Sequence, residues 1–180
     1  MFRKLISLWT AAAAVAWAGD LTQIPFNTIT GEATSLGAFQ GKVVLVVNTA
    51  SKCGLTKQYE GLEKLQQTYG GKGFTVVAFP CNDFGKQEPG TAKEIQEFCS
   101  TKFQTTFPLM EKIHVKGPEQ HALYKALTGK DGAFPGDVQW NFGKFLIGRD
   151  GKPLARFGSR QKPEDKEITG AIEKALEAAP

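Results

Sequence analysis

The sequence predicts an α/β domain in which helices flank a central mixed sheet, and two observations predict this class. Residues 42–48 and 74–79 are mostly β-branched or apolar, the pattern of strands that are buried on both faces of a sheet. Between them, apolar residues recur at the helical period: Leu55, Tyr59, Leu62, Leu65 and Tyr69. We expect the three segments to form a β-α-β unit with parallel strands and a right-handed crossover.

The next elements lie on both sides of this unit. Alternating β-favouring residues around a glycine predict an N-terminal β-hairpin over residues 26–36. After a polar, Gly-rich loop at 82–90, the residues 91–94 form a capping box, which opens a helix that runs through Cys99. Residues 107–110 are expected to form a short strand.

The last third of the chain completes the layout. A helix is expected between Pro118 and Gly129, because proline is tolerated at a helix start. The Asp-Gly pair at 150–151 separates two apolar runs and predicts a hairpin over 145–157. Apolar residues spaced by four predict a final helix over 168–176. The sum is a thioredoxin-like fold: a central mixed sheet flanked by helices, with an additional N-terminal β-hairpin.

The composition is that of one globular domain. The 180 residues are 41% hydrophobic and 22% charged, which excludes disorder, collagen-like repeats and coiled coil. This length is sufficient for a single core without disulfides or a metal. The 22 Lys and Arg residues and 18 Asp and Glu residues are spread along the chain, so we expect no nucleic-acid partner.

The first eighteen residues have the features of a secretory signal peptide. Arg3 and Lys4 precede an apolar run at 5–18, and Ala16-Trp17-Ala18 has the A-x-A pattern of a cleavage site. The run is shorter than the roughly 20 residues that cross a membrane, so we expect no stable membrane insertion, with an uncleaved anchor as the alternative. Cleavage would leave one domain, residues 19–180, exported to the periplasm or secreted.

The number and spacing of the cysteines favour a reactive thiol over structural disulfides. The chain has an odd number of cysteines, namely Cys53, Cys81 and Cys99, and no two of them have the C-x-x-C spacing. In an exported protein such a set does not predict structural disulfides. Each of the three could also be a buried, inert thiol.

Cys53 has a position that favours reactivity. It follows a buried strand and precedes a helix, the crevice in which open α/β sheets bind ligands. We expect the amides of the first helical turn and the helix dipole to face its sulfur and to stabilise a thiolate, which is a nucleophile.

Three blocks of the chain resemble the signature motifs of the glutathione peroxidase family: NTASKCG at 48–54, FPCNDFGKQEPG at 79–90, and WNF and KFL at 140–146. The resemblance covers nearly all of residues 21–177. It implies a thiol peroxidase that reduces hydrogen peroxide and organic or lipid hydroperoxides to water and alcohols. The family's catalytic residues correspond here to Cys53, Gln87, Trp140 and Asn141.

These residue types also suit the reaction by their own chemistry. A Cys53 thiolate would attack one peroxide oxygen and become a sulfenic acid, expelling water or an alcohol. The amide groups of Gln87 and Asn141 and the indole N–H of Trp140 are uncharged donors, which can stabilise the thiolate and the departing oxygen.

Further features concern the type of peroxidase. Cys53 stands where some members carry selenocysteine, and Cys99 looks like the resolving cysteine of the thioredoxin-dependent members. Alternatively, Cys99 is simply a buried residue on the apolar face of its helix. The short stretch 130–139 resembles that of monomeric members. The resemblance therefore implies a monomer without a cofactor, recycled by a thioredoxin-like protein or by glutathione as thiol co-substrate.

Several neighbouring residues have more ordinary roles. Asp83 stands where the family often has glutamine, and we expect its carboxylate to point to solvent. Cys81 is expected to pack at the end of its strand. We interpret Lys52, Lys86 and Lys144 as surface lysines, although they could attract anionic groups to the site.

Two other classes of function were considered. His114, His121 and the cysteines lack the paired spacing of a metal site, so no metal is expected. The alternative function is a non-catalytic thioredoxin-like module for redox sensing or binding, in which Cys53 oxidises and signals to a partner.

Overall fold

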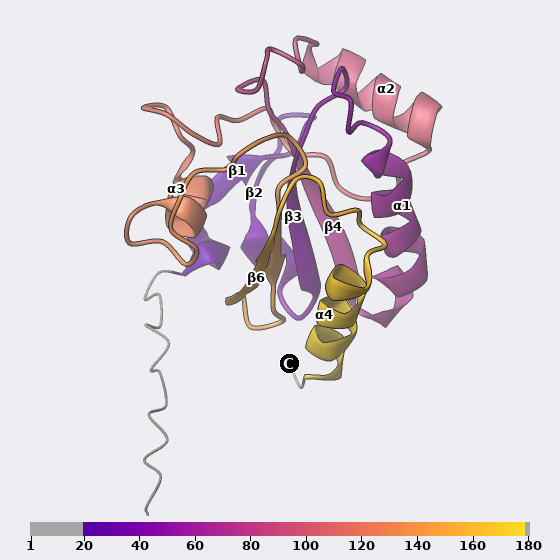
Figure 1. The fold of residues 1–180 in the computed structure, drawn as a ribbon, viewed down its shortest axis with the longest axis vertical. Coiled ribbons are helices and arrows are strands. Elements are labelled where there is room, and N and C mark those ends of the chain that lie inside the picture. Colours follow the sequence, from indigo (N-terminus) through magenta and orange to yellow (C-terminus); the bar gives the residue numbers. More distant parts are fainter. Residues whose placement is uncertain (1–19, 179–180) are drawn as a thin grey trace, which may run out of the picture.

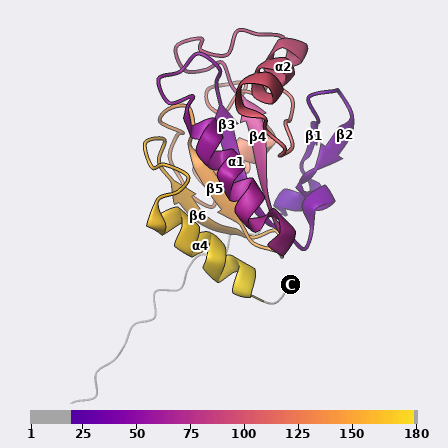
Figure 2. The same ribbon diagram turned by 90° about the vertical axis from the view of Figure 1, so that its right-hand side faces the viewer.

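A four-stranded mixed sheet is the centre of the computed structural model, which describes residues 20–178. Its strands lie in the order β4-β3-β5-β6 (Figures 1 and 2). Their bounds are β3 Val43–Thr49, β4 Phe74–Pro80, β5 Lys144–Ile147 and β6 Pro153–Phe157. Strands β3 and β4 are parallel, and β5 is antiparallel to both of its neighbours. The proposed signal peptide, residues 1–18, lies outside the described residues.

Strand β3 is internal to the sheet and buried along its whole length. Its side chains alternate between two hydrophobic clusters, with Val43, Leu45 and Val47 in one and Val44 and Val46 in the other. The prediction of a central strand covered on both faces is therefore confirmed.

Helices cover both faces of the sheet. Helices α1 (Gln58–Tyr69) and α4 (Lys166–Glu177) lie on one face, and α3 (Ala122–Thr128) lies on the other (Figures 1 and 2). Helix α2 (Ala92–Phe103) packs beside the start of α1. The predicted mixed sheet with helices on both faces is thus confirmed.

Both predicted hairpins are present, and each turns at a glycine. Strands β1 (Pro25–Asn27) and β2 (Ala33–Ser35) pair antiparallel around Gly31, whose φ is +92°. Strands β5 and β6 are joined through Gly151, whose φ is +78°. Such φ values are readily adopted only by glycine.

The short strand expected at 107–110 and the helix expected from Pro118 differ from the structure. Residues 107–110 form only isolated bridges, from Leu109 to Ala78 and from Met110 to Thr28, since Pro108 has no N–H with which to extend a ladder. The helix expected from Pro118 begins only at Ala122.

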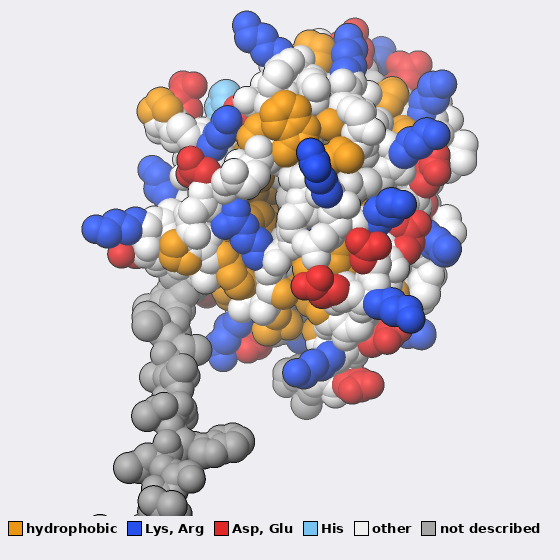
Figure 3. Space-filling view, viewed as in Figure 1, with side chains coloured by type: hydrophobic (Ala, Val, Ile, Leu, Met, Phe, Trp, Pro, Cys, Tyr) orange, Lys and Arg blue, Asp and Glu red, His pale blue; other side chains and the backbone are white. Residues whose placement is uncertain are grey.

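The face of the molecule that Figure 3 shows carries no single block of charge. Lys and Arg side chains are scattered over the face in Figure 3, with acidic side chains between them. None of the helices within residues 20–178 combines the length and the apolar character that crossing a membrane would require.

The capping box of α2 provides a test of this fold. The Thr91 side chain accepts the N–H of Glu94 at 3.3 Å, and the Glu94 carboxylate accepts the N–H of Thr91 at 2.7 Å. Thr91→Ala should lower the free energy of unfolding by about 1 kcal/mol in urea denaturation, because it leaves an end of the helix uncapped. Thr101→Ala, an exposed threonine within the same helix, is the control and should change stability by less; equal losses would contradict the capping role.

Candidate active site

Cys53 lies in a tight turn between β3 and α1, and its thiol is part of the hydrogen bonding of that turn. The Leu55 N–H donates to Cys53 Sγ at 3.3 Å. The Cys53 N–H donates to Thr56 Oγ1 at 3.0 Å, and the Thr56 hydroxyl donates to Ala50 O at 2.8 Å. These bonds connect residues 50–56 and fix the half-buried thiol relative to the end of β3.

The regular helix begins later than the sequence predicts. Residues from Cys53 onward bond at i to i+3, as in Thr56 N to Cys53 O at 3.0 Å, and α1 starts only at Gln58. The sulfur therefore faces an amide of the turn and not the first turn of α1, so that part of the expectation is wrong. That Cys53 forms a stabilised thiolate stays a prediction.

A cleft of about 820 Å³ opens at Cys53, within the size range of small-molecule sites. It brings together three of the four catalytic residues implied by the resemblance, although they are far apart in the sequence. Trp140 is 41% exposed and lies against the ring of Phe84, with 5.6 Å between ring centroids. The lining residues are Cys53, Gly54, Leu55, Gln87, Gln139, Trp140, Gly158, Ser159 and Arg160.

The fourth residue, Asn141, reaches the cleft through Gln87. Asn141 is fully buried, and its Nδ2 donates to Gln87 Oε1 at 2.9 Å. Because the carbonyl oxygen of Gln87 is engaged in this bond, the NH₂ group of Gln87 remains as a donor. Asn141 therefore orients Gln87.

Asn48 is a site residue that the sequence reasoning did not assign. Its side-chain Nδ2 donates to Trp140 O at 3.2 Å, and its main-chain carbonyl oxygen accepts the N–H of Phe142 at 2.6 Å. These bonds hold the 140–142 segment, including Phe142 at a φ of +67°, against the end of β3. The sequence does contain a signal for this role: Asn48 is a polar residue in an otherwise apolar strand, and a buried amide needs a hydrogen-bond partner.

Lys144 is not a surface lysine, contrary to the expectation. It is fully buried, and its Nζ donates to Phe142 O and to Gln161 O, both at 2.7 Å. Burial lowers the pKa of Lys144 to about 7. The side chain joins the 140–142 segment to the loop around Gln161. Lys52 and Lys86 are exposed, as expected.

Asp83 also differs from the expectation, because its carboxylate does not point to solvent. Its side chain is 8% exposed and accepts the Val115 N–H at 2.7 Å, while its other oxygen lies 2.6 Å from His114 Nδ1. Burial raises the pKa of this carboxyl, but the hydrogen bonds to Val115 and His114 outweigh it and leave the pKa lowered. Asp83 thus ties its loop to residues 114–115.

The other two cysteines are fully buried, and all three thiols are free. Burial raises the pKa of Cys81 to about 12 and that of Cys99 to about 11. Cys81 packs in the core at the end of β4, as expected. Cys99 packs on α2 in the same cluster as Tyr59, and its resolving role stays a prediction.

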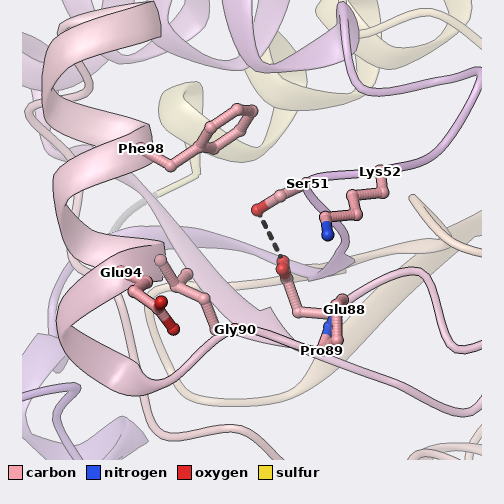
Figure 4. Close-up of a pocket in the computed structure, with 8 residues that line it drawn as sticks. Ser51, Lys52, Glu88, Pro89, Gly90, Glu94 and Phe98 are labelled. Atoms are coloured by element: carbon pink, nitrogen blue, oxygen red, sulfur yellow. Dashed lines mark hydrogen bonds between the residues drawn. The ribbon is translucent and has the colours of Figure 1, made fainter.

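A second cavity, of about 410 Å³, lies between the Cys53 turn and α2 (Figure 4). Glu88 lines it and is only 1% exposed, with the Ser51 hydroxyl donating to Glu88 Oε2 at 3.1 Å. Burial raises the pKa of Glu88. The sequence reasoning assigned no role to Glu88, although it directly follows Gln87 in the second block.

The histidines are engaged elsewhere. His114 bonds Asp83, and His121 Nδ1 accepts the Leu123 N–H at 3.2 Å at the start of α3. Within residues 20–178, no three His, Cys, Asp or Glu side chains are placed to hold a metal ion.

The family model that matches this chain and two of its relatives are named as peroxidases or hydroperoxide reductases. Residues 21–128 match the family model described as "Glutathione peroxidase". A hydroperoxy fatty acid reductase of Synechocystis is 49% identical over 160 residues, covering 83% of this chain and 92% of the relative. The thioredoxin/glutathione peroxidase BtuE of Escherichia coli is 43% identical over 169 residues, covering 82% and 92%.

Solved structures agree with these matches. A crystal structure of Trgpx in apo form has a TM-score of 0.70 at 38% identity, covering 91% of this chain and all of the other. A thioredoxin-family thiol:disulfide interchange protein of Chlorobium tepidum has a TM-score of 0.63 at 19% identity, covering 88% and 98%. The second likeness concerns the fold alone and confirms the predicted thioredoxin-like fold.

The buried carboxyl of Glu88 leads to a prediction about pH. A carboxyl with a raised pKa in the folded state contributes stability below its unfolded pKa and loses that contribution as pH rises through the folded pKa. Glu88→Gln, which stays neutral and keeps an acceptor for Ser51, should therefore gain stability relative to the wild type as pH rises from about 4 towards neutral. Urea denaturation over this range measures the difference.

Glu94 is the matched control, because it lines the same cavity but is exposed. Hydrogen bonds from the Thr91 backbone and side chain lower the pKa of Glu94. Glu94→Gln should therefore lose stability relative to the wild type as pH rises. The same sign for both variants would contradict the assignment.

Proposed function

The chain belongs to the glutathione peroxidase family and is a thiol peroxidase that reduces hydroperoxides, and on this premise we propose that Cys53 is its peroxide-reducing thiol. One observation carries the proposal. Cys53, Gln87 and Trp140 come from three distant blocks of the sequence and line one cleft, with Asn141 bonded to Gln87.

The reaction begins with attack of the Cys53 thiolate on one peroxide oxygen. The O–O bond breaks as the S–O bond forms, so that Cys53 becomes a sulfenic acid and the other oxygen leaves as water or an alcohol after taking up a proton. The NH₂ group of Gln87 and the indole N–H of Trp140 are the donors that stabilise the negative charge on the departing oxygen. Asn141 acts as a positioning residue by holding the carbonyl oxygen of Gln87.

In the second step, Cys99 resolves the sulfenic acid. The Cys99 sulfur attacks the Cys53 sulfur, an S–S bond forms, and the hydroxyl leaves with the thiol proton as water. Because Cys99 is fully buried on α2, this step requires local opening of that helix. A dithiol protein of the thioredoxin type then reduces the disulfide, since its second thiol releases the mixed disulfide intramolecularly. Glutathione is the alternative reductant.

The names of the relatives support this choice of substrate and reductant. One relative is named for hydroperoxy fatty acids and another for both thioredoxin and glutathione. We therefore propose hydrogen peroxide and lipid hydroperoxides as substrates, with no cofactor besides the thiol co-substrate. Export of a monomeric enzyme is also proposed, from the features of residues 1–18 and the short segment at 130–139.

The two donors and the positioning residue Asn141 can be tested one at a time in the first step. Gln87→Ala, Trp140→Phe and Asn141→Ala should each lower the rate constant for oxidation of Cys53 by hydrogen peroxide by about ten- to a thousandfold. Cys53→Ser should abolish turnover. Stopped-flow measurement of thiol loss gives these rates, with Gln67→Ala, an exposed amide on α1, as the control. Wild-type rates in all three variants would refute the assignment.

Resolution by Cys99 predicts a specific product. One equivalent of peroxide should give a Cys53–Cys99 disulfide with Cys81 free, and residues 95–103 should lose protection against hydrogen exchange. Cys99→Ser should react once with peroxide but lose turnover with thioredoxin, whereas Cys81→Ser should retain it. Mass spectrometry of the oxidised wild type decides the point, because a lasting sulfenic or sulfinic Cys53 without the disulfide would exclude Cys99.

A further inference from the structure

Apart from the reactive thiol of Cys53, the cleft is lined by a single charged side chain. Of the eight other lining residues, Arg160 alone carries a formal charge. Leu55 and the exposed indole of Trp140 contribute apolar surface in the same cleft. The site therefore combines one cation with an apolar wall, and no acidic residue lines it to neutralise that cation.

Arg160 differs from the other arginines in the described part of the chain. Arg149 Nη1 donates to Gly41 O at 2.7 Å, and Arg156 Nη2 donates to Asp137 O at 2.6 Å, so both guanidinium groups connect segments of the fold. Arg160 is exposed and, within residues 20–178, its guanidinium has no hydrogen bond or ion pair. Its five N–H donors are free for a ligand.

The backbone on both sides of Arg160 is nevertheless held in place. Ser159 O accepts Gln58 Nε2 at 2.7 Å, and the Ser159 hydroxyl donates to Trp140 O at 3.0 Å. On the other side, Gln161 O accepts Lys144 Nζ at 2.7 Å. A free guanidinium on an anchored backbone can bind a ligand with little loss of backbone entropy.

We propose that Arg160 determines substrate specificity by binding the carboxylate of a hydroperoxide whose alkyl chain packs against Leu55 and Trp140. The substrate class is an amphiphilic hydroperoxide with a free carboxylate, such as a hydroperoxy fatty acid as its free acid. The planar guanidinium matches a carboxylate through two parallel hydrogen bonds. This inference rests on the proposed function, because the peroxide group must reach Cys53 in the same cleft.

A carboxylate could also be supplied by a small thiol such as glutathione. The two sources act in different halves of the reaction, because the peroxide meets reduced Cys53 and the thiol meets oxidised Cys53. Measuring oxidation of the reduced enzyme without any reductant therefore isolates the contribution of the peroxide.

The experiment compares linoleic acid hydroperoxide with its methyl ester in single-turnover oxidation of Cys53, in a neutral detergent. The wild type should prefer the acid, and Arg160→Gln should reduce the ratio of acid to ester rate constants by about two- to fivefold, the range for one exposed ion pair. Arg160→Glu should lower the ratio further, by like-charge repulsion. The ester rate in each variant corrects for changes in the reactivity of Cys53.

Lys162→Gln is the matched control, since it removes the same charge from an exposed residue that does not line the cleft. It should leave the ratio unchanged. Equal ratios in the wild type and Arg160→Gln, or an effect of Arg160 on glutathione-dependent reduction alone, would overturn the inference. A wild type whose Cys53 is not oxidised even by hydrogen peroxide would instead overturn the proposed function, and this inference with it.

Discussion

The site depends on the hydrogen bonds that join the end of β3 to residues 140–142. The side chain of Asn48 donates to Trp140 O, and the main-chain oxygen of Asn48 accepts the Phe142 N–H. Cys53 follows on the same strand-to-helix connection. Because β3 is buried on both faces and paired on both sides, its end is a fixed point in the fold. The backbone therefore presents Trp140 to the cleft even though its side chain remains 41% exposed.

Two buried ionisable groups extend this arrangement. Lys144 links the 140–142 segment to the loop around Gln161, and Glu88 links its own loop to Ser51 in the Cys53 turn. Burying such groups costs free energy, and apolar residues of the same size could often replace them without loss of stability. Their hydrogen bonds instead join four segments of the chain in two pairs beside the cleft, which agrees with the need of a catalytic site for preorganised donors.

Local patterns in the sequence predicted much of this structure, and long-range contacts account for most of what they missed. The β-α-β unit, both hairpins and the capping box at Thr91 follow from periodicity and turn residues that act over short distances. The bond of Lys144 to Gln161 O and the contacts of Asp83 with residues 114–115 depend on groups that only the folded chain brings near. The late start of α1 arises from the Thr56 side chain, which bonds Cys53 N and Ala50 O in place of a regular helical turn.

The complete burial of Cys99 affects how readily peroxide inactivates the enzyme by overoxidising Cys53. Under the proposed function, the sulfenic acid forms in an open cleft, while the thiol that removes it lies in the core until α2 opens. During that interval a second peroxide molecule can oxidise the same sulfur to sulfinic acid, which ordinary thiols do not reduce. The opening rate of α2 therefore sets the peroxide concentration above which inactivation outpaces recycling, so tolerance to high peroxide is a property of helix packing.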